Sequence, residues 1–252
     1  MRVERLKQME QYIISQDAVS LTDLAEHFQI SMNTVRRDLN ELQKRGSIRK
    51  TYGGVTKGEN TTSLQTYSIR SKANPEAKSI IGKLAGSLIE DGDTIFLDSG
   101  STTPYILSNL GNHTNITVIS HSLPALVSAT RCQNINLISL GGMYNESTSS
   151  FWGSHTLDSI ADLHISKIFL STSGISTKGE LTNNTYLEAE IKRKIIRQGR
   201  QIILLADQTK FDKTGMITYA TFQDLDVIAT DGQPSRNYQT IIQRNKIRLL
   251  CP

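Results

Sequence analysis

Seven short runs rich in Ile, Leu and Val recur between residues 94 and 250, and they constrain the fold more than any other feature of the chain. They are TIFLD (94–98), ITVIS (116–120), INLISL (135–140), KIFLS (167–171), QIILLA (201–206), DVIAT (226–230) and KIRLL (246–250). Stretches with helical spacing separate them, including 123–129, 186–198 and 235–244. Runs that are apolar throughout are typical of strands buried on both faces. The pattern therefore predicts an α/β domain with a largely parallel sheet covered on both sides.

The residues that follow these runs are the candidate ligand-binding residues, because ligands of such sheets bind at the carboxyl ends of the strands. In chain order they are Asp98, Ser99, Gly100, Ser101, Thr102 and Thr103, then Ser120 and His121, Gly141 and Gly142, Gly174, and finally Asp207 and Lys210. Backbone amides where 98–103 enters a helix, with hydroxyls beside them, favour a phosphate or another anion. An ordinary strand-to-helix turn is the alternative. The Walker pattern GxxxxGK[ST] is absent, which argues against nucleotide triphosphate hydrolysis.

Several single residues are open to two interpretations. Glu188 and Lys192 lie four residues apart on an expected helix, which fits either a surface ion pair or a role in the pocket. Lys210 can offer its charge to a phosphate. His121 is either an acid, a base or a hydrogen-bond donor at the site, or a structural residue. The other histidines show no metal-ligand spacing, so we expect neither a metal nor a cofactor.

The stretch from Leu21 to Arg45 is typical of two short helices joined by a tight turn, with the helix-turn-helix at about Ser20 to Leu39. Leu21, Leu24, Ala25 and Phe28 form the apolar stripe of the first helix. Ser31 is a suitable N-cap for the second, whose buried side is Val35, Leu39 and Leu42. The opposite side of that second helix carries Asn33, Arg36, Arg37, Asn40 and Lys44.

This polar stripe suits the major groove of DNA, where Arg binds guanine and Asn binds adenine in bidentate fashion. A solvated basic surface is the alternative. Residues 48–55 add an expected hairpin with Gly53-Gly54 at its turn, a wing whose cations suit phosphates. The candidate DNA-binding residues are Ser31, Asn33, Thr34, Arg36, Arg37, Asn40, Lys44, Arg49 and Lys50.

Length and charge agree with a chain that is divided into an N-terminal helical domain and a larger α/β domain. A chain of 252 residues favours two domains. Residues 1–58 hold ten basic and seven acidic side chains, which gives +3 of the net +4.

Cys132 and Cys251 lie far apart, so neither a zinc site nor a disulfide framework is expected. The charged start is unlike a signal sequence, and no apolar run approaches the roughly 18 residues of a membrane span, so we expect a cytoplasmic protein.

The expected organisation has three parts. Residues 1–57 form a mainly α winged helix-turn-helix domain, and 58–74, rich in Thr, Ser and Asn, form a linker. Residues 75–252 form an α/β domain for effector sensing and oligomerisation. One short reading helix gives little affinity, so the pattern favours a homodimer or homotetramer on DNA.

Two sets of motifs resemble one family. SMNTVRRDL (31–39), followed by Leu42, Gly46 and Tyr52-Gly53-Gly54, resembles the winged helix-turn-helix of DeoR-type bacterial repressors. The second set resembles the effector domain of that family, whose fold is similar to ribose-5-phosphate isomerase and glucosamine-6-phosphate deaminase. It comprises 98–102, Gly141-Gly142, Trp152-Gly153, Gly174, 179–182, Glu188, Lys192 and 205–211. Ser120-His121 departs from the Thr-Asn that the family often has there.

The resemblance implies a repressor of a sugar-catabolism operon that binds double-stranded operator DNA and is released by a phosphorylated sugar. No membrane partner is expected. One alternative is a sugar-phosphate isomerase or deaminase with a regulatory N-terminal domain, in which Asp98, Glu188 or Asp207 acts on a carbon-bound proton. Another is a ligand-dependent activator, which the same residues would serve.

Overall fold

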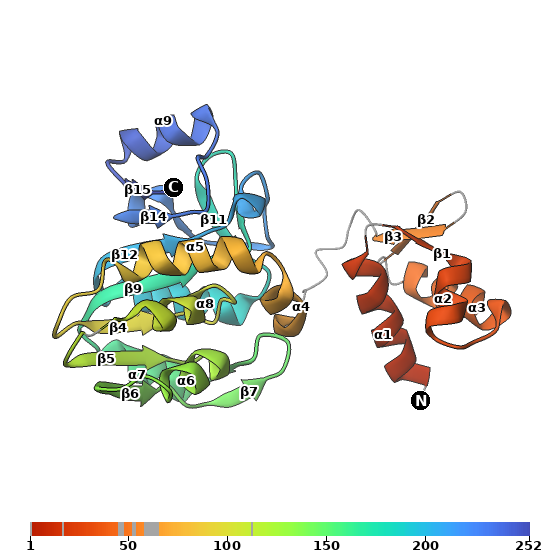
Figure 1. Cartoon of the computed structure of the whole chain (residues 1–252), viewed down its shortest axis with the longest axis horizontal. Helices are drawn as coiled ribbons and strands as arrows, with labels where there is room; N and C mark the ends of the chain where they lie inside the picture. Colours follow the sequence, from red (N-terminus) through yellow and green to blue (C-terminus); the bar gives the residue numbers. More distant parts are fainter. Residues whose placement is uncertain (1, 17, 45–47, 52–53, 58–65, 112) are drawn as a thin grey trace. The chain divides into compact units, whose positions relative to one another are not determined.

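The computed structural model describes residues 2–16, 18–44, 48–51, 54–57, 66–111 and 113–252. The chain divides into two compact units, Met1–Leu64 and Gln65–Pro252 (Figure 1).

The smaller unit is a winged helix-turn-helix, as the sequence predicts. Its elements are α1 (Arg2–Ser15), β1 (Val19–Ser20), α2 (Leu21–His27), α3 (Met32–Lys44), β2 (Ile48–Thr51) and β3 (Gly54–Lys57). The strands form an antiparallel sheet in the order β1-β3-β2. Met9, Leu24 and Leu39 are completely buried in its core. Tyr52 and Gly53 of the expected wing turn lie outside the described residues.

Capping and one ion pair fix the helices of this unit. Ser20 accepts from Asp23 N in a capping box that begins α2. Ser31 Oγ accepts from Thr34 N at 3.3 Å, which confirms Ser31 as the N-cap of α3. Arg5 Nε donates to the buried Asp38 Oδ2 at 2.9 Å and so ties α1 to α3. Of the two acids of α3, Asp38 therefore points into the protein.

The larger unit is built on a seven-stranded parallel sheet, and each of the seven expected runs supplies one strand. The strands are β4 (Thr94–Leu97), β5 (Ile116–Ser120), β6 (Ile135–Ser139), β9 (Ile165–Ser171), β12 (Gly199–Leu205), β14 (Val227–Ala229) and β15 (Arg248–Leu250). Their spatial order is β15-β14-β12-β9-β4-β5-β6, and every neighbouring pair is parallel. The α/β fold class is confirmed.

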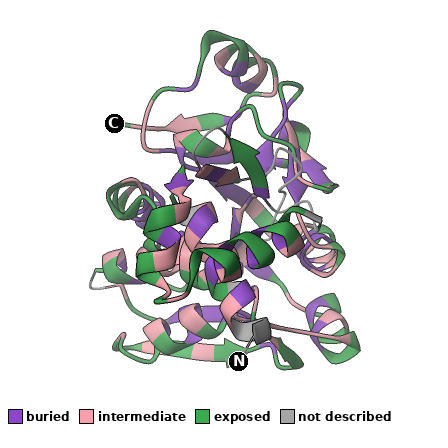
Figure 2. Ribbon diagram, turned by 90° about the vertical axis from the view of Figure 1, so that its right-hand side faces the viewer, coloured by how far each residue is buried: buried purple, intermediate pink, exposed green. Residues whose placement is uncertain are grey.

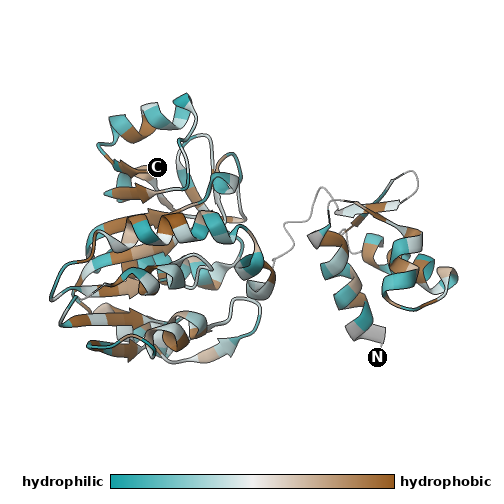
Figure 3. Cartoon of the chain, viewed as in Figure 1, coloured by the Kyte–Doolittle hydropathy of each residue, from teal (hydrophilic) through white to brown (hydrophobic). Residues whose placement is uncertain are grey.

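Two layers of helices cover the sheet. One layer comprises α5 (Pro75–Gly86), the 3-10 helix η1 (Thr103–Asn109) and α6 (Leu123–Ala129), which share a core with one sheet face. The other comprises α7 (Ser154–Ala161), α8 (Tyr186–Ile196) and α9 (Arg236–Arg244). Buried and exposed residues alternate around the helices (Figure 2), and apolar residues concentrate in the strands and α5 (Figure 3).

Shorter elements were not expected from the sequence. A small antiparallel sheet contains β10 (Gly174–Ile175), β11 (Glu180–Asn183) and β13 (Ile217–Thr221), and a hairpin contains β7 (Met143–Asn145) and β8 (Ser150–Trp152). Two further 3-10 turns are η2 (Gln208–Lys210) and η3 (Phe222–Asp224). Within the expected linker, 67–72 form helix α4 (Tyr67–Lys72) of the larger unit, and 58–65 lie outside the described residues.

The strand order reverses beside β4. The chain runs outward from β4 to β5 and β6, and then returns to the other side of β4 as β9, β12, β14 and β15. The connection after β4 enters η1 in one helical layer, whereas the connection after β9 leads to α8 in the other. Ligands of such sheets bind at the carboxyl ends of the strands beside the reversal, which here end just before Asp98 and at Ser171.

Candidate functional site

The predicted reading surface of α3 faces solvent. Asn33, Arg36, Arg37 and Asn40 are exposed, whereas Val35, Leu39 and Leu42 on the opposite side are completely buried. A helix that is packed on one side and carries Asn and Arg on the other is the form that enters a major groove.

The wing lies against this helix. Lys50 Nζ of β2 donates to Asn40 Oδ1 of α3, and Arg49 beside it is exposed. Thr34 is half-buried, with its hydroxyl 3.0 Å from that of Ser31. The side chain of Lys44 lies outside the described residues.

In the larger unit, Asp98 is the centre of a buried network at the reversal of strand order. It follows β4 and is completely buried. Its Oδ2 accepts from Lys192 Nζ of α8 at 2.7 Å, from Ser171 N of β9 at 3.0 Å, and from the Ser171 hydroxyl. Three elements that are distant in sequence therefore meet at one carboxylate.

This pairing keeps the Asp98 carboxylate ionised. Burial alone would raise the pKa of Asp98, but the Lys192 ammonium and His121 together hold it well below its ordinary value. Lys192 also lies 5.0 Å from the centre of the Tyr219 ring, and the Tyr219 hydroxyl donates to Ser171 O at 2.9 Å. Burial raises the pKa of Tyr219, so this hydroxyl stays protonated and remains a donor.

Glu188 holds the other side of the loop. Its carboxylate accepts from Ser99 Oγ at 3.1 Å, from Asn183 Nδ2 at 3.0 Å and from Thr185 Oγ1 at 2.8 Å. Glu188 is 9% exposed and Lys192 is 1% exposed. The surface ion pair that their spacing allowed is thereby excluded, because each residue bonds to a different part of the site.

His121 approaches Asp98 from the end of β5. Its Nδ1 donates to Phe151 O at 3.0 Å, and its Nε2 lies 3.8 Å from Asp98 Oδ1. Both of these facing atoms are buried without a hydrogen-bond partner among the described residues. Next to His121, Ser120 Oγ donates to Leu97 O at 2.7 Å, which joins the ends of β4 and β5.

The loop 98–103 is a tight turn with one outward residue. Thr103 Oγ1 donates to Asp98 O at 2.7 Å and to Gly100 O at 2.9 Å. A Cβ at Gly100 would lie 2.2 Å from Ser171 Oγ, so only glycine fits there. Ser101 is half-buried and the rest of the loop is buried. A ligand arriving from solvent would therefore meet Ser101 first.

The remaining predicted residues lie on the same sheet edge but outside this network. Asp207 Oδ1 accepts from Thr209 N at 2.9 Å and caps η2, which ends at the half-buried Lys210. Gly141 and Gly142 are exposed after β6. Gly174 is buried in β10, where its carbonyl accepts from the hydroxyls of Thr172 and Thr182.

Four residues of the network were not predicted from the sequence: Ser171, Asn183, Thr185 and Tyr219. The only sequence feature that marks Ser171 as a site residue is its position at the end of the run KIFLS.

No three His, Cys, Asp or Glu side chains come together as metal ligands would within the described ranges. The described helices also include none with the length and apolar character needed to cross a bilayer.

Both units match family models. The model described as DeoR-like helix-turn-helix domain matches residues 5–61, and that described as DeoR C terminal sensor domain matches residues 73–232. Solved structures with a similar fold include ribose 5-phosphate isomerase A from Methanocaldococcus jannaschii, at 20% identity over 55% of each chain with a TM-score of 0.41. That similarity concerns the fold and says nothing of activity.

Full-length relatives agree with the family models. The HTH-type transcriptional regulator IolR of Bacillus subtilis (strain 168) is 38% identical over 98% of both chains. The HTH-type transcriptional repressor GlcR of the same organism is 31% identical over 98% of this chain and 95% of its own length. The glycerol-3-phosphate regulon repressor of Escherichia coli (strain K12) is 29% identical over 94% of both chains. This chain therefore belongs to the DeoR family of DNA-binding transcriptional regulators.

Proposed function

We propose that α3 and the wing read duplex DNA, and that a phosphorylated sugar bound to the larger unit releases the protein from its operator. The exposed stripe of Asn33, Arg36, Arg37 and Asn40 opposite a fully buried seam carries the DNA part of this proposal. Arg49 and Lys50 extend that cationic surface toward the phosphates. Ser31, Thr34 and Lys44 complete the proposed contact set.

The DNA proposal is tested with duplexes selected from a random library by the full-length protein. Arg36→Ala and Arg37→Ala should each lose about 1–3 kcal/mol of binding and relax the preference at one base position. Lys50→Ala should weaken binding across sequences and lower the salt slope by about one unit. Arg131→Ala, an exposed cation of the larger unit, is the matched control. Unchanged binding by both arginine variants would remove α3 from the reading role.

We propose that the ligand binds at the carboxyl edge of β4 and β9, over the loop 98–103. The buried Asp98, Ser99, Glu188 and Lys192 hold that loop, so we assign them a positioning role. Ser101 of the loop and Lys210 after β12 are half-buried, so we propose that the Ser101 hydroxyl and amide and the Lys210 ammonium contact the ligand. Ser120, His121, Gly141, Gly142 and Gly174 border the same edge, and amides together with a lysine are typical phosphate ligands.

A thermal-shift screen of phosphorylated and unphosphorylated sugars tests this assignment. A ligand present at 100 times its dissociation constant should stabilise the larger unit by about 2.7 kcal/mol. Only phosphorylated members should do so, and Ser101→Val should abolish the shift. Equal shifts from the unphosphorylated sugars would contradict the phosphate site.

We further propose that the larger unit binds its ligand without converting it. Asp98 is buried and paired with Lys192, Glu188 is occupied by three donors, and the buried Asp207 accepts from Thr209 N. None of the three carboxylates is placed to take a carbon-bound proton from a ligand over Ser101. Incubation with pentose and hexose phosphates should yield no isomer or deaminated product, and turnover abolished by Asp98→Asn would contradict the proposal.

The sign of regulation and the assembly are part of the same proposal. The relatives include repressors and also the L-fucose operon activator of Haemophilus influenzae. The proposal of repression is supported by the similarity to GlcR and to the glycerol-3-phosphate regulon repressor, which extends over nearly the whole chain. A dimer or tetramer in the cytoplasm would place two reading helices on paired half-sites. Sedimentation with and without operator DNA measures the assembly, and ligand-induced release in a gel shift measures the sign.

A further inference from the structure

The side chain of His121 lies between two acceptors. His121 follows β5 and is 1% exposed. Its Nδ1 lies 3.0 Å from Phe151 O, and because a carbonyl oxygen can only accept, this nitrogen carries a proton. Its Nε2 faces Asp98 Oδ1 at 3.8 Å, and an ionised carboxylate also can only accept. A neutral imidazole has one N–H group, so either tautomer leaves a lone pair facing an acceptor.

The atoms on the Asp98 side of the ring are closed to solvent. Neither His121 Nε2 nor Asp98 Oδ1 has a hydrogen-bond partner among the residues that the structure describes. The other oxygen, Oδ2, is held by Lys192 Nζ at 2.7 Å, so the carboxylate stays ionised. A proton on Nε2 would give both atoms a partner after an approach of about 1 Å, which is the difference between 3.8 Å and the length of a charge-assisted hydrogen bond.

The buried charges of this network balance when His121 is a cation. Asp98 and Glu188 supply two negative charges, and Lys192 supplies one positive charge. The three donors to Glu188 described above are all uncharged. A neutral His121 therefore leaves the network with one excess negative charge, whereas an imidazolium brings it to zero. A buried charge without a counter-charge is unfavourable, so the network favours the imidazolium.

The surroundings of the ring accommodate a positive charge. Within the neighbouring described elements β5, α6, β6 and β8, no side chain is titratable. The Tyr219 hydroxyl stays protonated and uncharged, and Tyr144 and Glu146 of the β7–β8 hairpin are exposed. The Phe96 ring stacks on the imidazole, with ring centres 5.9 Å apart and 10° between the planes. The face of an aromatic ring attracts a cation.

We propose that His121 carries a proton on both ring nitrogens in the folded protein, and that this imidazolium joins the Asp98 loop to the hairpin of β7 and β8. The main chain supports the same link, since Phe151 N donates to His121 O at 2.8 Å and Leu123 N donates to Ser149 O at 3.0 Å. His121 thus holds the loop from the end of β5, whereas Lys192 holds it from α8.

For ligand binding, His121 is a positioning residue with an electrostatic effect. Because it is buried, it acts through the loop and not on the ligand itself. Its charge removes the excess negative charge that would otherwise lie beside loop 98–103 and repel a phosphate. This role rests on the proposed function, because it needs an anionic ligand over that loop. The charge of the ring is measured without any ligand, so the two proposals can fail separately.

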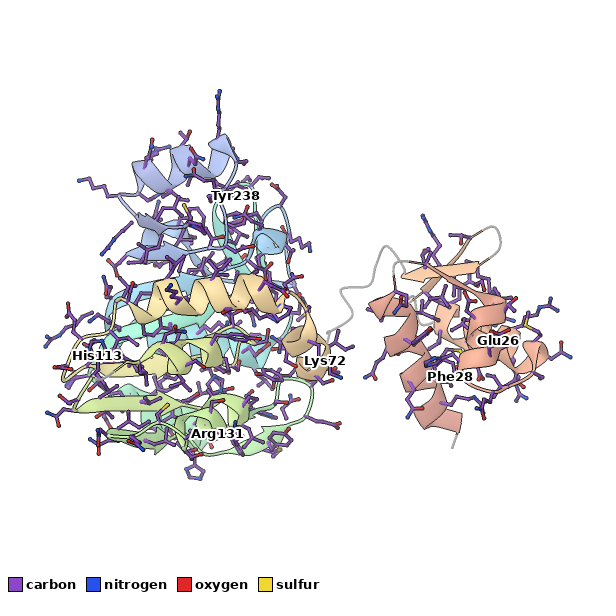
Figure 4. All side chains as sticks on the ribbon, in the orientation of Figure 1. Glu26, Phe28, Lys72, His113, Arg131 and Tyr238 are labelled. Atoms are coloured by element: carbon purple, nitrogen blue, oxygen red, sulfur yellow. The ribbon has the colours of Figure 1, made fainter. Side chains whose placement is uncertain are left out.

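Nitrogen-15 NMR of the full-length protein, labelled on its five histidines, reports the proton on each ring nitrogen. At pH 7.5 a free imidazole is about nine-tenths neutral. Both ring nitrogens of His121 should be protonated at that pH, and the signals that vanish in His121→Asn identify them. His155 is exposed and His113 pairs with the exposed Asp91 at 3.2 Å (Figure 4), so water reaches both rings. These two controls should lose their second proton at a lower pH than His121.

The pH dependence of stability tests the same proton. His121→Asn keeps an amide donor for Phe151 O but has no atom in the place of Nε2. The stability that the proton gives is complete below about pH 6.5, where the unfolded chain is also protonated, and it decreases as the pH rises. In urea unfolding, the ratio of the folding constants of wild type and His121→Asn should therefore fall about tenfold between about pH 5.5 and 7.5. His155→Asn is the matched control and should give a constant ratio.

The outcomes separate this inference from the proposed function. A lone pair on either ring nitrogen of His121 at pH 7.5 would overturn the inference, whether the gap to Asp98 is empty or holds a water molecule. A constant ratio for His121→Asn would overturn it as well. If that variant did not fold, replacing the other histidines in turn would identify the His121 signals by exclusion. A doubly protonated His121 in a protein that no phosphorylated sugar stabilises would overturn the proposed phosphate site alone.

Discussion

The substitution Asp98→Asn tests the role of the buried network most directly. Asn has nearly the shape of Asp and can still accept from Ser171 N, so the change removes the charge and little else. Lys192, 1% exposed and 2.7 Å from the Asp98 carboxylate, would then keep a buried ammonium with no counter-charge in contact. The ammonium would keep only uncharged partners, namely the carbonyl and hydroxyl oxygens of Ser171 and the face of the Tyr219 ring.

The expected loss is large for one isosteric change. Removing one partner of a buried ion pair costs about 3–5 kcal/mol, because the other charge stays buried and unpaired. In a unit of this size each kcal/mol lowers Tm by about 2–4 °C, so the melting temperature should fall by about 6–20 °C. The double variant Asp98→Asn/Lys192→Met removes both charges and should be less destabilised than the sum of the single changes.

Urea unfolding and calorimetry of the full-length protein measure these values. Asp158→Asn is the matched control, because it makes the same chemical change at an exposed position of α7. The control should stay within about 0.5 kcal/mol of wild type, as is usual for surface substitutions. If Asp98→Asn also stayed within that range, or if the double variant were additive, the ion pair would not be what holds the loop.

Three further predictions follow from the same network. The pKa of Asp98 is held below its ordinary 3.8, so the stability that ionised Asp98 gives the folded protein is complete above that pH and is lost as the pH falls below it. Acid unfolding followed by circular dichroism should show this loss in wild type and not in Asp98→Asn. Gly100→Ala places a Cβ 2.2 Å from Ser171 Oγ and should destabilise by about 1–3 kcal/mol in urea, whereas Gly141→Ala, with open space around it and no positive φ, should not. Tyr219→Phe loses one hydrogen bond to Ser171 O while its ring stays near Lys192, so it should cost only about 1 kcal/mol in the same assay.

The sequence located the strands well because each of the seven is buried on both faces and is apolar throughout. It did not reveal their order, and the order places Ser171 of β9 beside Asp98 of β4. Glu188 and Lys192 show the same limit, since their spacing fits a surface pair equally well. Their burial becomes evident only once α8 is packed on the sheet.

Short elements escaped prediction for a local reason. Strands β10, β11 and β13 are two to five residues long and contain Gly, Thr and Asn, so no hydrophobic period marks them. Tyr219 lies on β13 and Asn183 on β11, so the partners they supply to Ser171 and Glu188 were missed as well. The burial of Lys78 in α5, which is 3% exposed, could not be predicted either, because a lysine in the first turns of an amphipathic helix is ordinarily solvated.

The contact between Lys50 and Asn40 has a consequence for altering which operator the protein selects. Moving α3 alone into another family member would transfer Asn40 without the lysine that orients its amide. The transplanted Asn40 would then lack this hydrogen bond, although every residue of the helix was kept. With the DNA contacts proposed above, helix and wing form one binding surface, and we expect that the two have to be exchanged together.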